Sequence, residues 1–296
     1  MTEAPGHSNT GYDIDWAEHT EHLTRAARDD AGWYAAMAAE LVRPTDRLLA
    51  DVGCGGAGMA AALARAGSPE TAVVAVDGDD EVLAAAKQNL AAADHGTRVR
   101  LAKVDIAAGD EALAVALGDE PDVIWASAVV HHAGDQQATV NALAGLLAPG
   151  GRLALAEGGL QGRHLPWDVG VGRPGLEVRL EAAHDRWFAT MRAELPDSVP
   201  MPYGWTVALS RAGLGDVTSR STLIERPSPL GADDTATVVD RFTHWVERLR
   251  SVDLLEPEDV AAWDRLLNPD DPAWLGNRDD LYVLEARSVH IGSRAR

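Results

Sequence analysis

The sequence has almost no cysteine and no long apolar run. Its one cysteine, Cys54, excludes an intrachain disulfide, and a reducing interior is the simplest compartment for such a chain. No stretch of about eighteen apolar residues occurs, so no transmembrane helix is predicted. Met1 to Asp15 is polar and acidic and lacks the apolar core of a signal peptide. Together these absences favour a cytoplasmic protein.

Positive charge is also scarce, with 26 lysines and arginines against 46 acidic residues and a formal net charge of −20. Proteins that bind nucleic acid usually present a basic surface that neutralises phosphates. The long-range field of this chain repels polyanions and anionic membranes alike. We therefore expect a small-molecule partner, neutral or cationic, and neither nucleic acid nor a membrane. The sequence leaves the oligomeric state open.

Strand and helix patterns alternate through the first half of the chain. Short apolar, often β-branched runs predict strands at Leu48–Val52, Ala72–Val76, Val99–Val104, Val123–Ala128 and Arg152–Ala156. Helices are predicted between them at Met59–Ala66, Asp80–Ala93, Asp110–Leu117 and Gln136–Leu147. This alternation is typical of an α/β protein with a Rossmann-like parallel sheet and right-handed crossovers.

The two flanking regions have a different pattern. Helices are predicted at Trp16–Arg28 and Ala31–Val42, and after Glu157 a glycine- and proline-rich stretch begins. Later elements are predicted as helices at Leu176–Leu195, Thr206–Ala212 and Asp233–Leu267, broken near Pro257, and as strands at Val217–Ile224 and Leu281–Val289. We expect seven strands with a helical insertion between the last two. The predicted parts are a helical lid (1–45), a cofactor-binding core (46–160) and an acceptor-binding region (161–296).

A glycine-rich loop follows the first strand. Gly53, Gly55 and Gly58 match the pattern G-x-G-x-x-G, which is weak evidence alone and equally suggests a dinucleotide. Asp51 precedes the loop, and a carboxylate beside a pyrophosphate would cost ~1–4 kcal/mol per charge pair. S-adenosylmethionine has no phosphate and carries an ammonium and a sulfonium, which a carboxylate attracts. The loop therefore favours S-adenosylmethionine.

Two further carboxylates end the next strands. Asp77 can accept hydrogen bonds from ribose hydroxyls, a feature that both cofactors share. Asp105 can accept a bond from the amine of adenine, and Ile106 offers the base an apolar surface.

Five motifs in order resemble those of the class I S-adenosylmethionine-dependent methyltransferases. They are Leu48-Leu-Ala-Asp-Val-Gly-Cys-Gly, Val76-Asp-Gly-Asp, Val104-Asp-Ile, Ala128-Val-Val-His-His and Pro149-Gly-Gly-Arg-Leu-Ala-Leu. The resemblance is strong over about Asp46 to Glu157. It implies a seven-stranded sheet of order 3-2-1-4-5-7-6, with strand 7 antiparallel. It also implies small-molecule methyl transfer from S-adenosylmethionine.

The resemblance also implies roles for individual residues. Asp51, Gly53 and Gly55 would hold the methionine part, Asp77 and Gly78 the ribose, and Asp105 and Ile106 the adenine, with Ser127 beside them. One departure is Ala57, where many members have a glycine. This departure puts the backbone contacts of the loop in doubt and leaves the cofactor unchanged.

The carboxyl ends of parallel strands hold the ligand in such sheets. Ser127, His131, His132 and Glu157 are therefore expected near the transferred methyl group. A histidine could act as a general base for a protonated acceptor, or the pair could only pack over the cofactor. No acidic residue follows at a clear ligand spacing, so no metal is expected there. Glu18 to His22 has a metal-like spacing that fits a solvated helix face better.

Acceptor specificity is expected from outside the core. Candidate pocket residues are Glu157, His164, Trp167, Tyr203 and Trp205, while Tyr12 and Trp16 are candidates to touch the cofactor from the lid. The acceptor, the methylated atom (O, N or C) and the need for a base stay open. The alternatives are a peptide or protein carboxyl methyltransferase, a cofactor-binding protein without turnover, and a nicotinamide-dependent oxidoreductase, which Asp51 disfavours.

Overall fold

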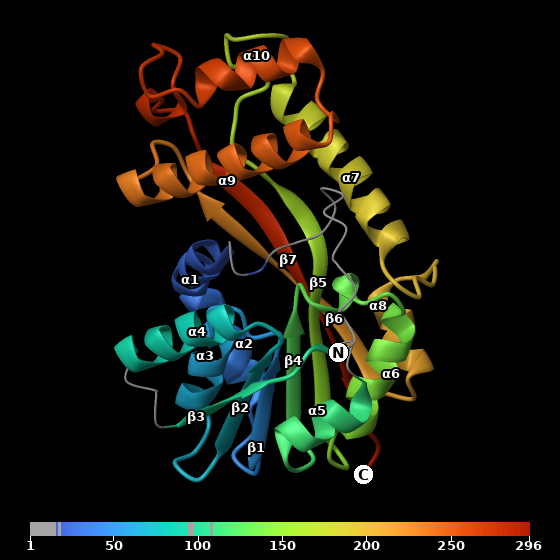
Figure 1. The fold of residues 1–296 in the computed structure, drawn as a ribbon. Helices are drawn as coiled ribbons and strands as arrows, with labels where there is room; N and C mark the ends of the chain where they lie inside the picture. The colour runs from blue at the N-terminus through green and yellow to red at the C-terminus, as the bar shows by residue number, and fades with distance from the viewer. Residues whose placement is uncertain (1–15, 17–18, 94–97, 107–108) are drawn as a thin grey trace, which may run out of the picture. The chain divides into compact units, whose positions relative to one another are not determined.

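The computed structural model describes residues 16, 19–93, 98–106 and 109–296. In this part of the chain seven strands form one sheet in the order β3-β2-β1-β4-β5-β7-β6, with β7 antiparallel (Figure 1). The strands are β1 (Leu48–Val52), β2 (Ala72–Asp77), β3 (Val99–Lys103), β4 (Val123–Ser127), β5 (Arg152–Arg163), β6 (Gly215–Arg226) and β7 (Val283–Ser293). The predicted fold class and strand order are confirmed.

The helices alternate with the strands and then form longer insertions. They are α1 (Thr20–Asp29), α2 (Ala31–Leu41), α3 (Gly58–Ala66), α4 (Asp80–Ala92), α5 (Asp110–Leu117), α6 (Gln136–Leu146), α7 (Leu176–Glu194), α8 (Trp205–Arg211), α9 (Ala232–Ser251) and α10 (Pro257–Leu266). Pro257 begins α10, where its missing N–H is not needed, and this explains the predicted break. The predicted insertion between β6 and β7 contains α9 and α10.

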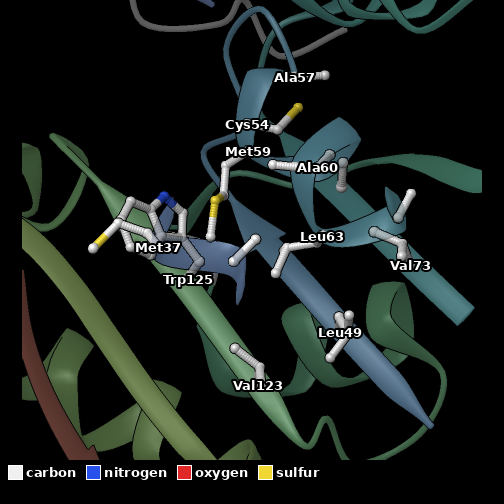
Figure 2. Packing of buried hydrophobic residues seen from close by; sticks show 14 of the residues in the cluster. Met37, Leu49, Cys54, Ala57, Met59, Ala60, Leu63, Val73, Val123 and Trp125 are labelled. Carbon is white, nitrogen blue, oxygen red and sulfur yellow. The ribbon is translucent and has the colours of Figure 1, made fainter. Parts of the chain in front are cut away.

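The centre of the parallel part of the sheet is buried on both faces. Every residue of β1 is buried, because helices cover the sheet on either side. On one face α2, α3 and α4 pack over Leu49, Val73 and Trp125, and Figure 2 shows Met37 and Met59 beside the Trp125 indole. On the other face α5, α6 and α8 pack over alternate residues of the same strands, such as Ala50. These two cores fix the strand ends that carry the site.

The described chain divides into two compact units. The first, here the sheet unit, comprises the described residues up to Gly158 with Leu195–Ser221 and Ser288–Arg296. The second, here the helical unit, comprises Gly159–Glu194 and Thr222–Arg287. The three-part division predicted from the sequence stays a prediction.

The core of the helical unit is aromatic. His164, Phe242 and Trp263 follow one another with ring centroids 5.5 and 4.8 Å apart, and His184 stacks on Trp245 at 4.3 Å. Burial, with nearby arginines, lowers the pKa of His184 to about 4, so this imidazole is neutral at pH 7.

The structure corrects the ends of two strands. The sequence predicts that the last strand ends at Val289, but β7 continues to Ser293. Strand β5 was expected to end at Ala156, but it continues to Arg163. Gly158 and Gly159 have positive φ values of 73° and 121°, so they allow an irregular stretch within the strand. In the sequence, the same glycine pair resembles the end of a strand. No helix in the described residues is both long and apolar enough to cross a membrane.

Candidate functional site

The glycine-rich loop joins β1 to α3 in a left-handed backbone path. Gly53 and Gly55 have φ values of 69° and 49°, and Ala57 is also left-handed at 60°. Ala57 therefore has a left-handed backbone, the conformation that glycine adopts most readily. A Cβ at Gly53 would overlap the Val129 side chain, so this glycine lets the loops after β1 and β4 approach closely.

Asp51 is a buried carboxylate beneath this loop. Its side chain accepts the Ala60 backbone N–H at 2.9 Å, and the residue is 2% exposed. Burial raises the pKa of Asp51 to about 7, and the nearby Asp77 charge adds to the effect. Because burial disfavours the ionised carboxylate, a cationic group bound beside Asp51 would stabilise that form.

Asp77 lies at the end of β2 and faces the same loop. It accepts the Gly55 backbone N–H at 3.0 Å, and burial raises its pKa above the usual range. A Cβ at Gly78 would lie 3.4 Å from Asp105, so the ends of β2 and β3 adjoin there. Ile106 and Ser127 are half-buried, at the ends of β3 and β4. The structure thus places the eight residues predicted to bind the cofactor at or just beyond the carboxyl ends of β1 to β4.

His131 and Glu157 form a hydrogen-bonded pair at this edge. Glu157 Oε2 lies 2.7 Å from His131 Nδ1, and Oε1 accepts the backbone N–H groups of Val129 and Val130 at 3.0 and 2.8 Å. The Glu157 side chain is 2% exposed and that of His131 is 23% exposed. Since Glu157 is held by three donors, it fixes the orientation of the imidazole. With Nδ1 donating to the carboxylate, Nε2 is the basic nitrogen.

His132 has different surroundings. Its ring lies 4.1 Å from the His131 ring and makes an edge contact at 5.1 Å with Trp16, which is 37% exposed. The structure therefore gives the two neighbouring histidines different partners. Tyr12 and Glu18 lie outside the described residues.

The other predicted pocket residues are spread over both units. Tyr203 and Trp205 pack against the core beside α6, where Tyr203 donates to Gln137 at 3.0 Å. In the helical unit, His164 is buried with Nδ1 2.8 Å from Glu177, while Trp167 is 68% exposed. Of the five, Glu157 is joined to a predicted catalytic histidine by a hydrogen bond.

The sequence did not single out Asn89 or Val129. Asn89 lies in α4 and bonds to the glycine loop, while Val129 packs against that loop from the end of β4. Neither belongs to a spacing pattern, so only their three-dimensional contacts identify them. Among the described residues, no group of three or more His, Cys, Asp or Glu side chains is arranged to hold a metal.

The central part of the chain matches a known family. Residues 50–153 match the family model of a methyltransferase domain. A search of curated proteins found none similar to this chain in sequence.

Solved structures share the fold at low sequence identity. A protein from Bacillus halodurans is 14% identical with a TM-score of 0.50, over 90% of this chain and 100% of that one. A methyltransferase from Thiobacillus denitrificans, in complex with S-adenosyl-L-homocysteine, is 17% identical with a TM-score of 0.50, over 96% and 100%. Haemonchus contortus phosphoethanolamine N-methyltransferase 2, in complex with phosphomonomethylethanolamine and S-adenosylhomocysteine, is 13% identical with a TM-score of 0.51, over 96% and 61%. This chain thus spans about three fifths of that last protein, and 59% of an O-methyltransferase family protein from Burkholderia thailandensis.

Proposed function

We propose that this chain, which carries a methyltransferase domain of the class I fold, transfers a methyl group from S-adenosylmethionine to a small-molecule acceptor in specialised metabolism. The observation that supports this most is the paired arrangement at the edge of the sheet. Asp51 and Asp77 flank the glycine loop, and the His131–Glu157 pair stands at the ends of the neighbouring strands. The first pair suits a cationic cofactor and the second suits proton removal.

The residues present fit S-adenosylmethionine. Asp51 is buried and holds its carboxylate close to the loop, which suits an ammonium and a sulfonium and opposes a pyrophosphate. Asp77 can accept hydrogen bonds from ribose hydroxyls, and Asp105 with Ile106 can hold the adenine. When bound, the cofactor supplies an activated methyl group whose leaving sulfur needs no further protonation.

The remaining task of the protein is to position the acceptor and, where needed, to take its proton. His131 Nε2 is the basic nitrogen, and Glu157 holds the ring and stabilises the imidazolium that proton transfer creates. Such a base is useful for a hydroxyl, an ammonium or an acidic carbon. The net charge of −20 favours a neutral or cationic acceptor, and the single cysteine favours a reducing, cytoplasmic setting.

The cofactor is tested by calorimetric titration with S-adenosylhomocysteine, with NAD as the control ligand. We expect the protein to bind S-adenosylhomocysteine and not NAD. Asp77→Ala should lower the affinity for S-adenosylhomocysteine at least tenfold, because each lost hydrogen bond to a charged group costs about 1.5–3 kcal/mol. Binding of NAD in its place would overturn the proposal and favour an oxidoreductase.

The acceptor is then sought with labelled S-adenosylmethionine in a broad metabolite extract. Transfer to a peptide or protein fraction instead would support a carboxyl methyltransferase. Cofactor binding without transfer to any fraction would identify a binding protein without turnover.

A further inference from the structure

Helix α1 lies directly on the glycine-rich loop. A Cβ at Gly56 would come within 2.5 Å of the Leu23 carbonyl oxygen, and one at Gly58 within 3.0 Å of Ala27 Cα. Neither of these glycines has a positive φ, in contrast to Gly53 and Gly55. Their small size is therefore required by the close approach of α1, whereas Gly53 and Gly55 are required by the backbone turn.

Asn89 ties α1 to this loop from a third element. Its side-chain amide in α4 donates to the Gly56 carbonyl oxygen at 3.1 Å and to Thr24 Oγ1 at 3.2 Å. One half-buried side chain thus joins α4, α1 and the loop, and Figure 1 shows α1 beside α4. The hydrogen bond to Thr24 is a side-chain link between α1 and the body of the sheet unit.

The segment that contains α1 also reaches the opposite loop of the site. Trp16 contacts the His132 ring, which follows β4, whereas Leu23 and Ala27 contact the loop after β1. Strands β1 and β4 are neighbours, and the order of the sheet reverses between them. In open α/β sheets the ligand lies at this switch point, beyond the carboxyl ends of the strands. Trp16 and helix α1 therefore lie on the two sides of the proposed cofactor position.

We propose that Asn89 is a positioning residue that holds α1 against the glycine loop, and that release of its bond to Thr24 opens the path for cofactor exchange. The proposal rests on the proposed function in taking S-adenosylmethionine as the cofactor. It assigns Asn89 no contact with the reacting atoms. It predicts that this hydrogen bond controls how fast the cofactor leaves.

The test is the rate constant for S-adenosylhomocysteine dissociation, measured by surface plasmon resonance on the full chain. Asn89→Ala and Thr24→Val should each raise it about 3- to 10-fold, since a net hydrogen bond contributes about 0.5–1.5 kcal/mol. Gln88→Ala, an exposed amide on the same helix, is the matched control and should leave the rate within twofold. In the Asn89→Ala background, Thr24→Val should have no further effect, because the bond is already gone.

A third variant tests the contact from the other side. Gly56→Ala keeps an allowed backbone conformation but places a methyl group against α1, so it should also speed dissociation. Thermal melts identify any variant that does not fold. The dissociation rates of the folded variants then test the role of Asn89. Dissociation rates unchanged in Asn89→Ala and Thr24→Val, or effects that multiply in the double variant, would overturn the proposal. Failure of the unaltered protein to bind S-adenosylhomocysteine would instead contradict the cofactor assignment.

Discussion

At the scale of single residues, two buried carboxylates are central to the proposed function. Asp51 and Glu157 are 2% and 3% exposed, but their partners differ. Glu157 accepts three hydrogen bonds, including one from a histidine, and is satisfied by the protein. Asp51 accepts the Ala60 backbone N–H, and burial raises its pKa to about 7. In the proposed function, Glu157 therefore suits the orientation of a base, and Asp51 suits the binding of a cation.

Cofactor binding should depend on pH through Asp51. Below about pH 7 the carboxyl is mostly protonated, and a cationic ligand must displace that proton to bind the ionised form. The affinity for S-adenosylhomocysteine, which presents its ammonium group to the carboxylate, should therefore rise about fivefold between pH 6 and pH 7, reach about tenfold by pH 8 and level off above it. Calorimetry at these pH values measures the change, and Asp51→Asn should bind weakly with no such slope. An affinity of the unaltered protein that is flat from pH 6 to pH 8 would contradict the role of Asp51.

Stability of the unliganded protein should change in the opposite sense. The folded-state pKa of Asp51 is raised above its usual value of 3.8, so the neutral carboxyl stabilises the fold at low pH. That contribution is lost as the pH rises from about 4 through about 7. As the pH rises towards 7, Asp51 therefore increases the affinity for the ligand and lowers the stability of the unliganded protein.

The His131–Glu157 pair predicts a loss of turnover without a loss of cofactor. Glu157→Gln and His131→Gln should each lower kcat about 10²- to 10⁴-fold for an acceptor that must lose a proton, because the base is misoriented or absent. S-adenosylhomocysteine affinity should stay within about threefold. His132→Gln is the control, since the His132 ring packs edge-on against Trp16, whereas Glu157 bonds to His131. Equal losses from all three variants would show that the histidines only pack over the site.

At the scale of secondary-structure elements, a buried ion pair fixes the start of β5 to the end of α2. Arg152 donates to Asp46 with N–O distances of 3.1 and 2.5 Å and also donates to the Leu41 carbonyl oxygen. Both side chains are at most 5% exposed. The pair therefore orders the junction through which the chain enters β1.

Removal of one partner should strongly destabilise the protein. Asp46→Asn and Arg152→Met each leave an uncompensated buried group. Each should lower the free energy of unfolding, measured in urea, by about 3–5 kcal/mol. The double variant should cost much less than the sum of the two, because no lone charge then stays buried. Strictly additive costs would show that the two side chains act independently.

The same scale explains where sequence reasoning succeeded and where it did not. The regular alternation of short apolar runs with helical patterns predicted each strand from β1 to β4 within a residue or two, because short apolar runs between turn residues are a clear local signal. The prediction ended β5 too early, because the glycine pair Gly158–Gly159 is typical of a strand end. Pairing within the sheet keeps the chain extended beyond it. Long-range pairing overrides the local signal there.

At the scale of the whole molecule, the sequence alone determined the fold class and the cofactor, and it predicted the residues of the cofactor site and a small-molecule partner. These follow from periodicity, from glycines and carboxylates at strand ends, and from net charge, all of which are local or additive. Only the tertiary structure decided that Glu157 bonds to His131, that Ala57 is left-handed, and that Asn89 joins α1 to the glycine loop. The partners in these two bonds are 26 and 65 residues apart in the chain. Packing of strands and helices brings them together, and no local pattern encodes that packing.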